Sequence, residues 1–251
     1  MESQALANAI WAVAKRDHKD KAFIDDLLVA AMWRPSGNLG RWCLPKLDRF
    51  NAQGLANTIW ALATLDYHDH AFMGALLAAA KPKLHSFTTQ NLSNTAWALA
   101  TLDCHDHAAF MDDLLVEAKP KLSSFKAQEL SNMAWALATL DYHDHAAFMD
   151  DLLVEPSPSS FMGALLVEAK PKLSSFKAQE LSNMAWALAT LDYHDHAAFM
   201  GALLEEAKIN LRGFNIIDVH QMSIAIAKLN IKDADFTRAL EARRAQLGIR
   251  K

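Results

Sequence analysis

The chain has 251 residues, about half of them apolar, and a formal net charge of −4. That length is enough to bury a large core, and the mild acidity excludes a strongly basic nucleic-acid-binding domain. Glycine and proline are scarce, which favours helices. Cys43 and Cys104 stand at non-equivalent places and suggest no disulfide framework, so we expect a reducing compartment. No apolar run approaches the length of about 18 residues that crosses a bilayer, and we expect no membrane association.

One passage is repeated along the chain, most clearly as QELSNMAWALATLDYHDHAAFM at residues 128–149 and again at 179–200. A Phe ten residues before each Trp marks successive copies at intervals of 37, 38, 51 and 38 residues. Such a period is typical of structural units that stack on one another. We therefore expect a single array over residues 1–251, with repeats at 1–49 (insertion 33–44), 50–86, 87–124, 125–175 (insertion near 150–162), 176–213 and 214–251, the last a divergent C-terminal cap.

The two long copies differ from the others by insertions. WRPSGNLGRWC, from Trp33 to Cys43, is rich in turn-forming residues and predicts a loop. PSPSS, at residues 156–160, lies between FMDDLLVE and FMGALLVE, so half a helix is written twice. A recent duplication explains this arrangement, and we expect the segment around 150–162 to be mobile.

Each copy predicts two helices. Asn51 can cap a first helix that ends near Leu65, with Gln53 and Asn57 on its polar face and Trp60 at the border. Asp69 can cap a second, amphipathic helix that ends near Pro82. Neither helix can bury its apolar face alone, so neighbouring pairs must stack. The predicted fold is all-α: an α-solenoid of about five to six helix-turn-helix repeats.

The copies FNAQGLANTIWALATLDYHDHAFMGALLAAAKPKL and FTTQNLSNTAWALATLDCHDH resemble the octotricopeptide-type repeats of organellar proteins, which are related to the FAST-kinase-like, RAP-domain group. The resemblance covers nearly the whole chain. It implies a protein of the mitochondrial matrix or chloroplast stroma that binds single-stranded RNA, an organellar transcript, and acts in RNA processing, transcript stability or translation, alongside other RNA-processing proteins.

The chain departs from that family in two places. Asp66 and its equivalents stand where a glycine is expected, and no RAP-like segment follows the repeats, which argues against a nuclease-like activity. The first residues, MESQALANAIW, already lie inside a repeat. We therefore expect either no targeting peptide or a fragment whose true start lies upstream.

The first candidate RNA-binding set is the polar face of the first helices, whose amides can hydrogen-bond to bases and phosphates. The alternative is structural: each Asn bonds to a neighbouring loop and each Gln caps its own helix. Positions that differ between copies would choose the base, and the two identical copies would then read the same base. The polar set is Gln53, Asn57, Gln90, Asn94, Gln128, Asn132, Gln179 and Asn183. The base-choosing positions are those of Asn51 and Ala52, of Gly54, and of Thr58, each with its equivalents in the other copies; the last group is Thr58, Thr95, Met133 and Met184.

The second candidate set is a recurring lysine pair near the end of each second helix, which stacking would gather into a basic ridge along a phosphate backbone. The alternative is an ordinary solvated helix end, where cations also complement the helix dipole. The pairs are Lys81 and Lys83, Lys119 and Lys121, and Lys170 and Lys172, followed by Lys208 with Arg212.

The remaining patterns predict structure rather than chemistry. The tryptophans could stack on bases, but they stand beside apolar residues, so we assign them to packing between repeats. In the recurring HDH, the Asp is expected to cap a helix with exposed histidines on either side, and we expect no metal and no cofactor. No nucleophile with its base and no phosphate loop is found, so we do not expect an enzyme. The alternative to RNA binding is a protein-interaction scaffold of the HEAT, armadillo or TPR type.

Overall fold

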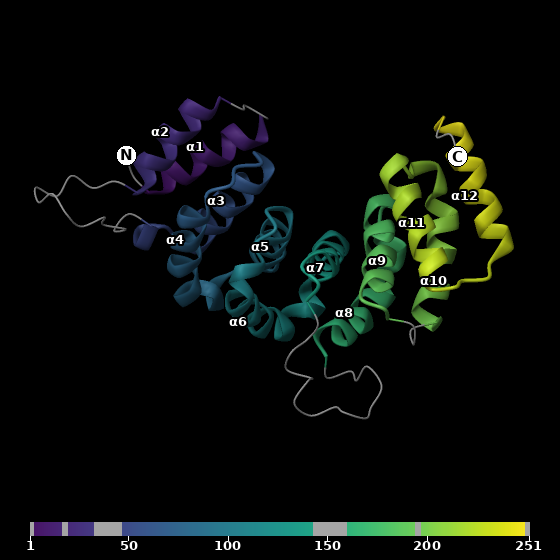
Figure 1. Ribbon diagram of the computed structural model, residues 1–251. Helices are drawn as coiled ribbons and strands as arrows, with labels where there is room; N and C mark the ends of the chain where they lie inside the picture. Colours follow the sequence, from purple (N-terminus) through teal and green to yellow (C-terminus); the bar gives the residue numbers. More distant parts are fainter. Residues whose placement is uncertain (1–2, 17–19, 33–46, 143–159, 194–196, 249–251) are drawn as a thin grey trace, which may run out of the picture. The chain divides into compact units, whose positions relative to one another are not determined.

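The computed structural model describes residues 3–16, 20–32, 47–142, 160–193 and 197–248, which are helical with no strand among them (Figure 1). The predicted all-α fold of stacked helix pairs is confirmed. The chain forms two compact units, Met1–Ala118 and Lys119–Lys251, and each is described by itself. The insertion at 33–44, and the one near 150–162 except for its last three residues, lie outside the described ranges, so the mobility expected there stays a prediction.

The first unit is a stack of three helix pairs. Its first helices, α1 (Ser3–Lys15), α3 (Ala52–Thr64) and α5 (Thr89–Thr101), pack side by side. The second helices pack each on its own partner: α2 (Lys21–Met32), α4 (His70–Ala80) and α6 (Ala108–Ala118). Short 3-10 turns complete the unit: η1 (Leu47–Arg49), η2 (Lys81–Ser86) and η3 (His105–His107).

The second unit repeats this arrangement. Its first helices are α7 (Ala127–Thr139), α9 (Ala178–Thr190) and α11 (Ile216–Lys228), with α9 between the other two. Its second helices are α8 (Phe161–Ala169), α10 (Ala197–Asn210) and α12 (Ala234–Gln246), and its 3-10 turns are η4 (Lys119–Ser124), η6 (Lys170–Ser175) and η7 (Leu211–Gly213). Of the two half-helices written around PSPSS, the second one therefore supplies α8.

The starts of the first helices follow from local capping. The Asn51 carboxamide oxygen accepts a hydrogen bond from the Gly54 N–H at 2.8 Å, which confirms the predicted cap. The Thr88 hydroxyl accepts one from the Asn91 N–H at 3.2 Å and caps the next first helix in the same way. Lys126 is a poor capping residue, yet α7 begins directly after it. There the Glu129 carboxylate accepts from the Lys126 N–H at 2.9 Å, the return half of a capping box, which fixes the start of the helix from its third residue.

The ends of the first helices explain why a glycine was expected at Asp66. Asp66 has φ 54°, and its equivalents in the following copies are also left-handed. The Asp66 N–H donates to Ala63 and the Tyr67 N–H donates to Leu62, which is the hydrogen-bond pattern of a Schellman helix end. Asp tolerates this conformation better than most residues because its short side chain can hydrogen-bond locally. The left-handed equivalents are Asp103, Asp141, Asp192 and Asn230.

Each repeat has the same core. The phase-marking Phe precedes each first helix as a hydrophobic staple and is at most 2 % exposed in all five copies that carry it. The leucines and alanines of the first helices fill the space between neighbouring pairs. One face of each first helix stays outside this core, and it holds the candidate site. The five residues are Phe50, Phe87, Phe125, Phe176 and Phe214.

Candidate nucleic-acid interface

Beyond the first helical residue, a single row of four positions remains accessible on α3, α5, α7 and α9, at spacing i, i+4, i+7 and i+11. The helices α1 and α11 have the same row and further accessible positions beside it. On α3, Gln53 is exposed, and Asn57, Trp60 and Thr64 are half-buried, while the positions between them are almost all buried. At about 100° per residue, these four positions fall within about 60° of one another around the helix. We call this the accessible row. Its members are Gln4, Asn8, Trp11, Lys15; Gln53, Asn57, Trp60, Thr64; Gln90, Asn94, Trp97, Thr101; Gln128, Asn132, Trp135, Thr139; Gln179, Asn183, Trp186, Thr190; and Ile217, Gln221, Ile224, Lys228.

The tryptophans belong to this row, so they are accessible as well as packed between repeats. The rings of Trp135 and Trp186, on neighbouring first helices, lie 6.4 Å apart between centroids at an angle of 34°. They pack on each other as predicted, and both are only half-buried. The signal was present in the spacing, because each Trp follows the row's Gln by seven residues and therefore lies about 20° from it around the helix.

The proposed base-choosing positions at Thr58 and its equivalents require a correction. Thr58, Thr95, Met133 and Met184 are fully buried between the first helices. The Thr58 hydroxyl donates to the Gly54 carbonyl at 2.8 Å, so it serves its own helix. These side chains have no surface with which to contact a base. The helical period already places Thr58 about 140° from Gln53, on the core side.

Two of the candidate lysines have partners inside the protein. The Lys83 ammonium donates to the carbonyls of Asp48 and Phe50, both at 2.7 Å. Lys172 repeats the arrangement with Ser123 at 2.7 Å and Phe125 at 2.9 Å. Both lysines are half-buried. Each joins the 3-10 turn after its helix pair, η2 or η6, to the chain just before that pair. In the last repeat, Arg243 donates to the Phe214 carbonyl in the same way.

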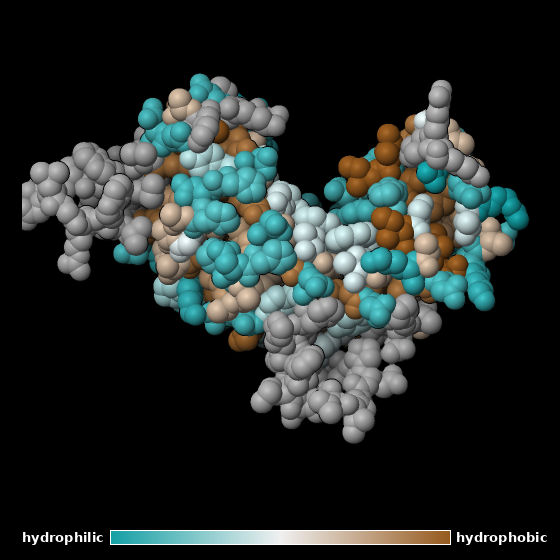
Figure 2. Space-filling view, in the orientation of Figure 1, coloured by the Kyte–Doolittle hydropathy of each residue, from teal (hydrophilic) through white to brown (hydrophobic). Residues whose placement is uncertain are grey.

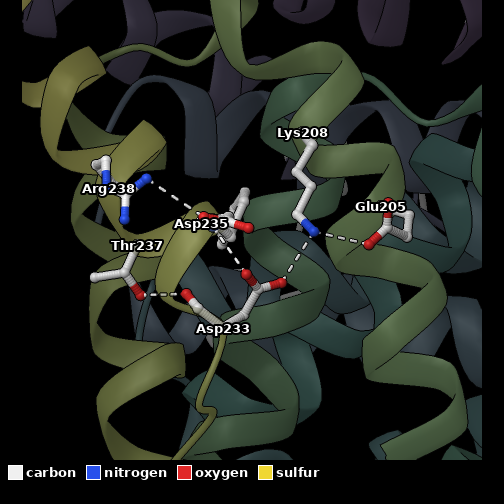
Figure 3. A network of polar contacts seen from close by, with 7 residues as sticks. Glu205, Lys208, Asp233, Asp235, Thr237 and Arg238 are labelled. Carbon is white, nitrogen blue, oxygen red and sulfur yellow. Dashed lines mark hydrogen bonds and ion pairs between the residues drawn. The ribbon is translucent and has the colours of Figure 1, made fainter.

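The first lysine of the pair contacts the following repeat in two copies. Lys81 and Lys208 each form an ion pair with an aspartate of that repeat. Lys81 lies 2.6 Å from the Asp113 carboxylate of α6. Lys208 of α10 lies 2.8 Å from Glu205 and 3.0 Å from Asp233, the residue that caps α12 (Figure 3). Hydrogen bonds to Glu205 and Asp233 raise the pKa of Lys208 above its usual value. Lys119 and Lys121 also interact within the protein, and Lys170 and Arg212 are exposed.

The accessible row lacks acidic residues. The chain has 29 Asp and Glu, and none of them occupies any of the 24 row positions. The only charged members are Lys15 and Lys228, in the outermost first helices, and the Lys15 ammonium lies 4.7 Å from the centre of the Trp11 ring. A neutral surface of amides and indoles, free of carboxylates, is compatible with an anionic polymer.

The histidine motif is structural where it is described. The Asp69 carboxylate accepts from the Phe72 N–H at 2.9 Å, the predicted helix cap. His68 lies 3.1 Å from Asp66 on the surface. Within the described ranges no group of three or more His, Cys, Asp or Glu is arranged to hold a metal ion. The copies at 143–145 and 194–196 lie outside those ranges.

Comparison with known proteins gives one family. The family model of the Tbc2 translation factor, N-terminal domain, matches residues 3–153, more than half of the chain. No curated protein matches closely enough to count as a relative. In the part of the chain that the structure describes, no helix is both long enough and apolar enough to cross a membrane.

Proposed function

This chain belongs to the family of the Tbc2 translation factor N-terminal domain. From that premise we propose that it binds single-stranded RNA through the accessible row. Its role is then the regulation of translation, processing or stability of a transcript. The resemblance to octotricopeptide-type repeats supports an organellar role, and the proposed partner is an organellar transcript.

The observation that supports the proposal most is the uniform chemistry of the row. Four successive described copies present Gln, Asn, Trp and Thr in the same order on first helices that pack side by side within each unit. Amides can donate to and accept from base edges and phosphates, and indole faces can stack on any base. Core packing does not require Gln or Asn on an exposed face, whereas binding of a polar polymer does.

The proposal is tested by placing carboxylates on the row without changing its shape. Asn132→Asp with Asn183→Asp adds two negative charges on α7 and α9, and both side chains keep their size. We expect the affinity of the full chain for a randomised single-stranded RNA pool, measured by fluorescence anisotropy, to fall more than tenfold, because the new carboxylates repel phosphates. Circular dichroism checks that the helices remain.

A matched control adds the same charge elsewhere. Val116 and Val167 are 72 % and 63 % exposed on the second helices α6 and α8. Val116→Asp with Val167→Asp is expected to change RNA affinity less than threefold. Equal losses in both double variants would assign the effect to net charge, and absence of RNA binding by the unmodified chain would refute the proposal.

One observation favours the scaffold alternative. Ile216 and Ile217, at the start of α11, and Ile209, near the end of α10, are all more than half exposed. Ile224 stands at the Trp position of the α11 row. Figure 2 shows apolar atoms gathered over the α11 part of the second unit. An exposed apolar cluster is typical of a protein contact. A protein-binding role for α11 is compatible with RNA binding on α7 and α9.

A further inference from the structure

The two ends of the accessible row differ in charge. We call the end at the start of the first helices and the end after their last residues its two edges, and their charges determine how an RNA strand can lie on the row. In the second unit, a shallow hollow of about 550 Å³ opens where α7 begins, and an equivalent one of about 530 Å³ opens where α9 begins. The first is lined by Lys126, Lys172 and Lys177, and the second by Lys177 and Arg212. Gln128 and Gln179, the first members of their rows, line one hollow each.

The charges in these hollows are positive on balance. In the first hollow, Glu180 is the acidic member, and its carboxylate accepts a hydrogen bond from the Lys177 N–H at 2.9 Å. Lys172 is held by backbone carbonyls, whereas Lys126 and Lys177 are exposed. In the second hollow, Asp218 is the acidic member, and it is 1 % exposed and accepts from the Asn215 N–H. The exposed side chains that can approach an anion there are therefore cations.

At the opposite edge, an exposed aspartate follows each of the two helices. Asp141 ends α7 and Asp192 ends α9, both left-handed and both exposed. An α-helix rises about 1.5 Å per residue, so the exposed lysine just before a row and the exposed aspartate just after it are separated by about 20 Å along the helix. Trp135 and Trp186 lie between these edges, closer to the aspartates.

We propose, on the basis of the RNA binding argued above, that the RNA strand lies across α7 and α9 with its phosphates at the Lys126 and Lys177 edge and its bases directed over Asn132, Asn183 and the paired tryptophans. In this orientation the cations attract the phosphates, and the aspartates, which would repel them, lie at the far edge. The bases stack on the accessible faces of the half-buried indoles. The two rows are identical in sequence, so neighbouring nucleotides meet the same surface.

The test separates phosphate contacts from base contacts with two probes, a randomised RNA pool and an abasic sugar-phosphate strand of the same length. Lys126→Gln with Lys177→Gln should weaken binding of both probes. It should also reduce the slope of log affinity against log salt by about 1.4, which corresponds to two phosphate contacts on a single strand. Lys170→Gln, an exposed lysine outside both hollows, should leave the slope unchanged.

A second pair of variants tests the base side. Trp135→Leu with Trp186→Leu keeps an apolar side chain for packing, and it should weaken binding of the RNA pool at least tenfold while leaving the abasic strand and the salt slope unchanged. Asp141→Asn with Asp192→Asn should change the salt slope by less than 0.5, because phosphates pass far from that edge.

The outcomes distinguish the two proposals. If the aspartate variant strengthens binding and steepens the salt slope while the lysine variant changes neither, the backbone lies at the other edge, and the orientation is wrong although RNA binding stands. If the tryptophan variant weakens both probes equally, the indoles serve packing alone, and the orientation is again wrong. If the unmodified chain binds neither probe, the function proposed above fails, and the orientation fails with it.

Discussion

At the scale of single residues, the helix starts in this protein are fixed by side chains that accept hydrogen bonds from nearby backbone N–H groups. Glu129 accepts from the Lys126 N–H at the start of α7, and the aspartates after α3, α5, α7 and α9 accept a left-handed conformation that glycine would adopt more easily. The residue identities that differ between repeats at these places therefore serve the same local geometry by different means.

The phenol of Tyr67 leads to a prediction about pH. Its hydroxyl donates to the Asp25 carboxylate of α2 at 2.5 Å, and this hydrogen bond, with burial and nearby carboxylates, raises the pKa of Tyr67 from 10.0 to about 12. The folded state thus favours the neutral phenol. The stabilisation is complete below pH 10, where both states are protonated, and it is lost as pH rises from 10 to 12.

Tyr67→Phe removes this contribution. Below pH 10 we expect the variant to melt at a lower temperature than the unmodified chain, and between pH 10 and 12 we expect the two melting temperatures to converge. Thermal melts followed by circular dichroism across this range check the prediction. Parallel curves at all pH values would show that the hydrogen bond to Asp25 does not contribute.

At the scale of the element, the turns that join helix pairs are fastened by cations. Lys172 donates two hydrogen bonds to backbone carbonyls, at the position where the sequence suggested a phosphate-binding ridge. A charged donor shared between two carbonyls stabilises a turn because otherwise those carbonyls would need water. This role depends on the three-dimensional approach of η6 to the start of α7.

Lys172→Gln is therefore expected to lower the free energy of unfolding by about 1.5 kcal/mol, the lower range for hydrogen bonds to a charged group, because both carbonyls lose their donor. Urea denaturation measures the change. The neighbouring Lys170→Gln is the control and should leave stability unchanged. A loss of RNA affinity without a loss of stability in Lys172→Gln would instead support the phosphate-binding ridge.

At the scale of the whole molecule, the array is divided into two compact units. Repeat proteins derive their stability from each repeat and its contacts with immediate neighbours, so part of an array can fold when its own interfaces are complete. In the second unit, α9 is packed between α7 and α11, and the buried Phe125, Phe176 and Phe214 belong to successive repeats.

We expect the segment 119–251, expressed alone, to be helical and to unfold cooperatively in urea. Circular dichroism provides both measurements. A segment that stays unfolded, or that unfolds without cooperativity, would show that its core requires the first unit.

The sequence by itself determined the repeat, the all-α class, and the starts and ends of most helices, because period, caps and breakers act over a few residues. It also identified Gln53 and Asn57 as one polar face. Only the tertiary structure decided which candidate cations are held inside the protein: Lys83 donates to two carbonyls, and Lys81 forms an ion pair with Asp113. Burial and long-range hydrogen bonds depend on how neighbouring helices are rotated against each other, and residues distant in the sequence set that rotation.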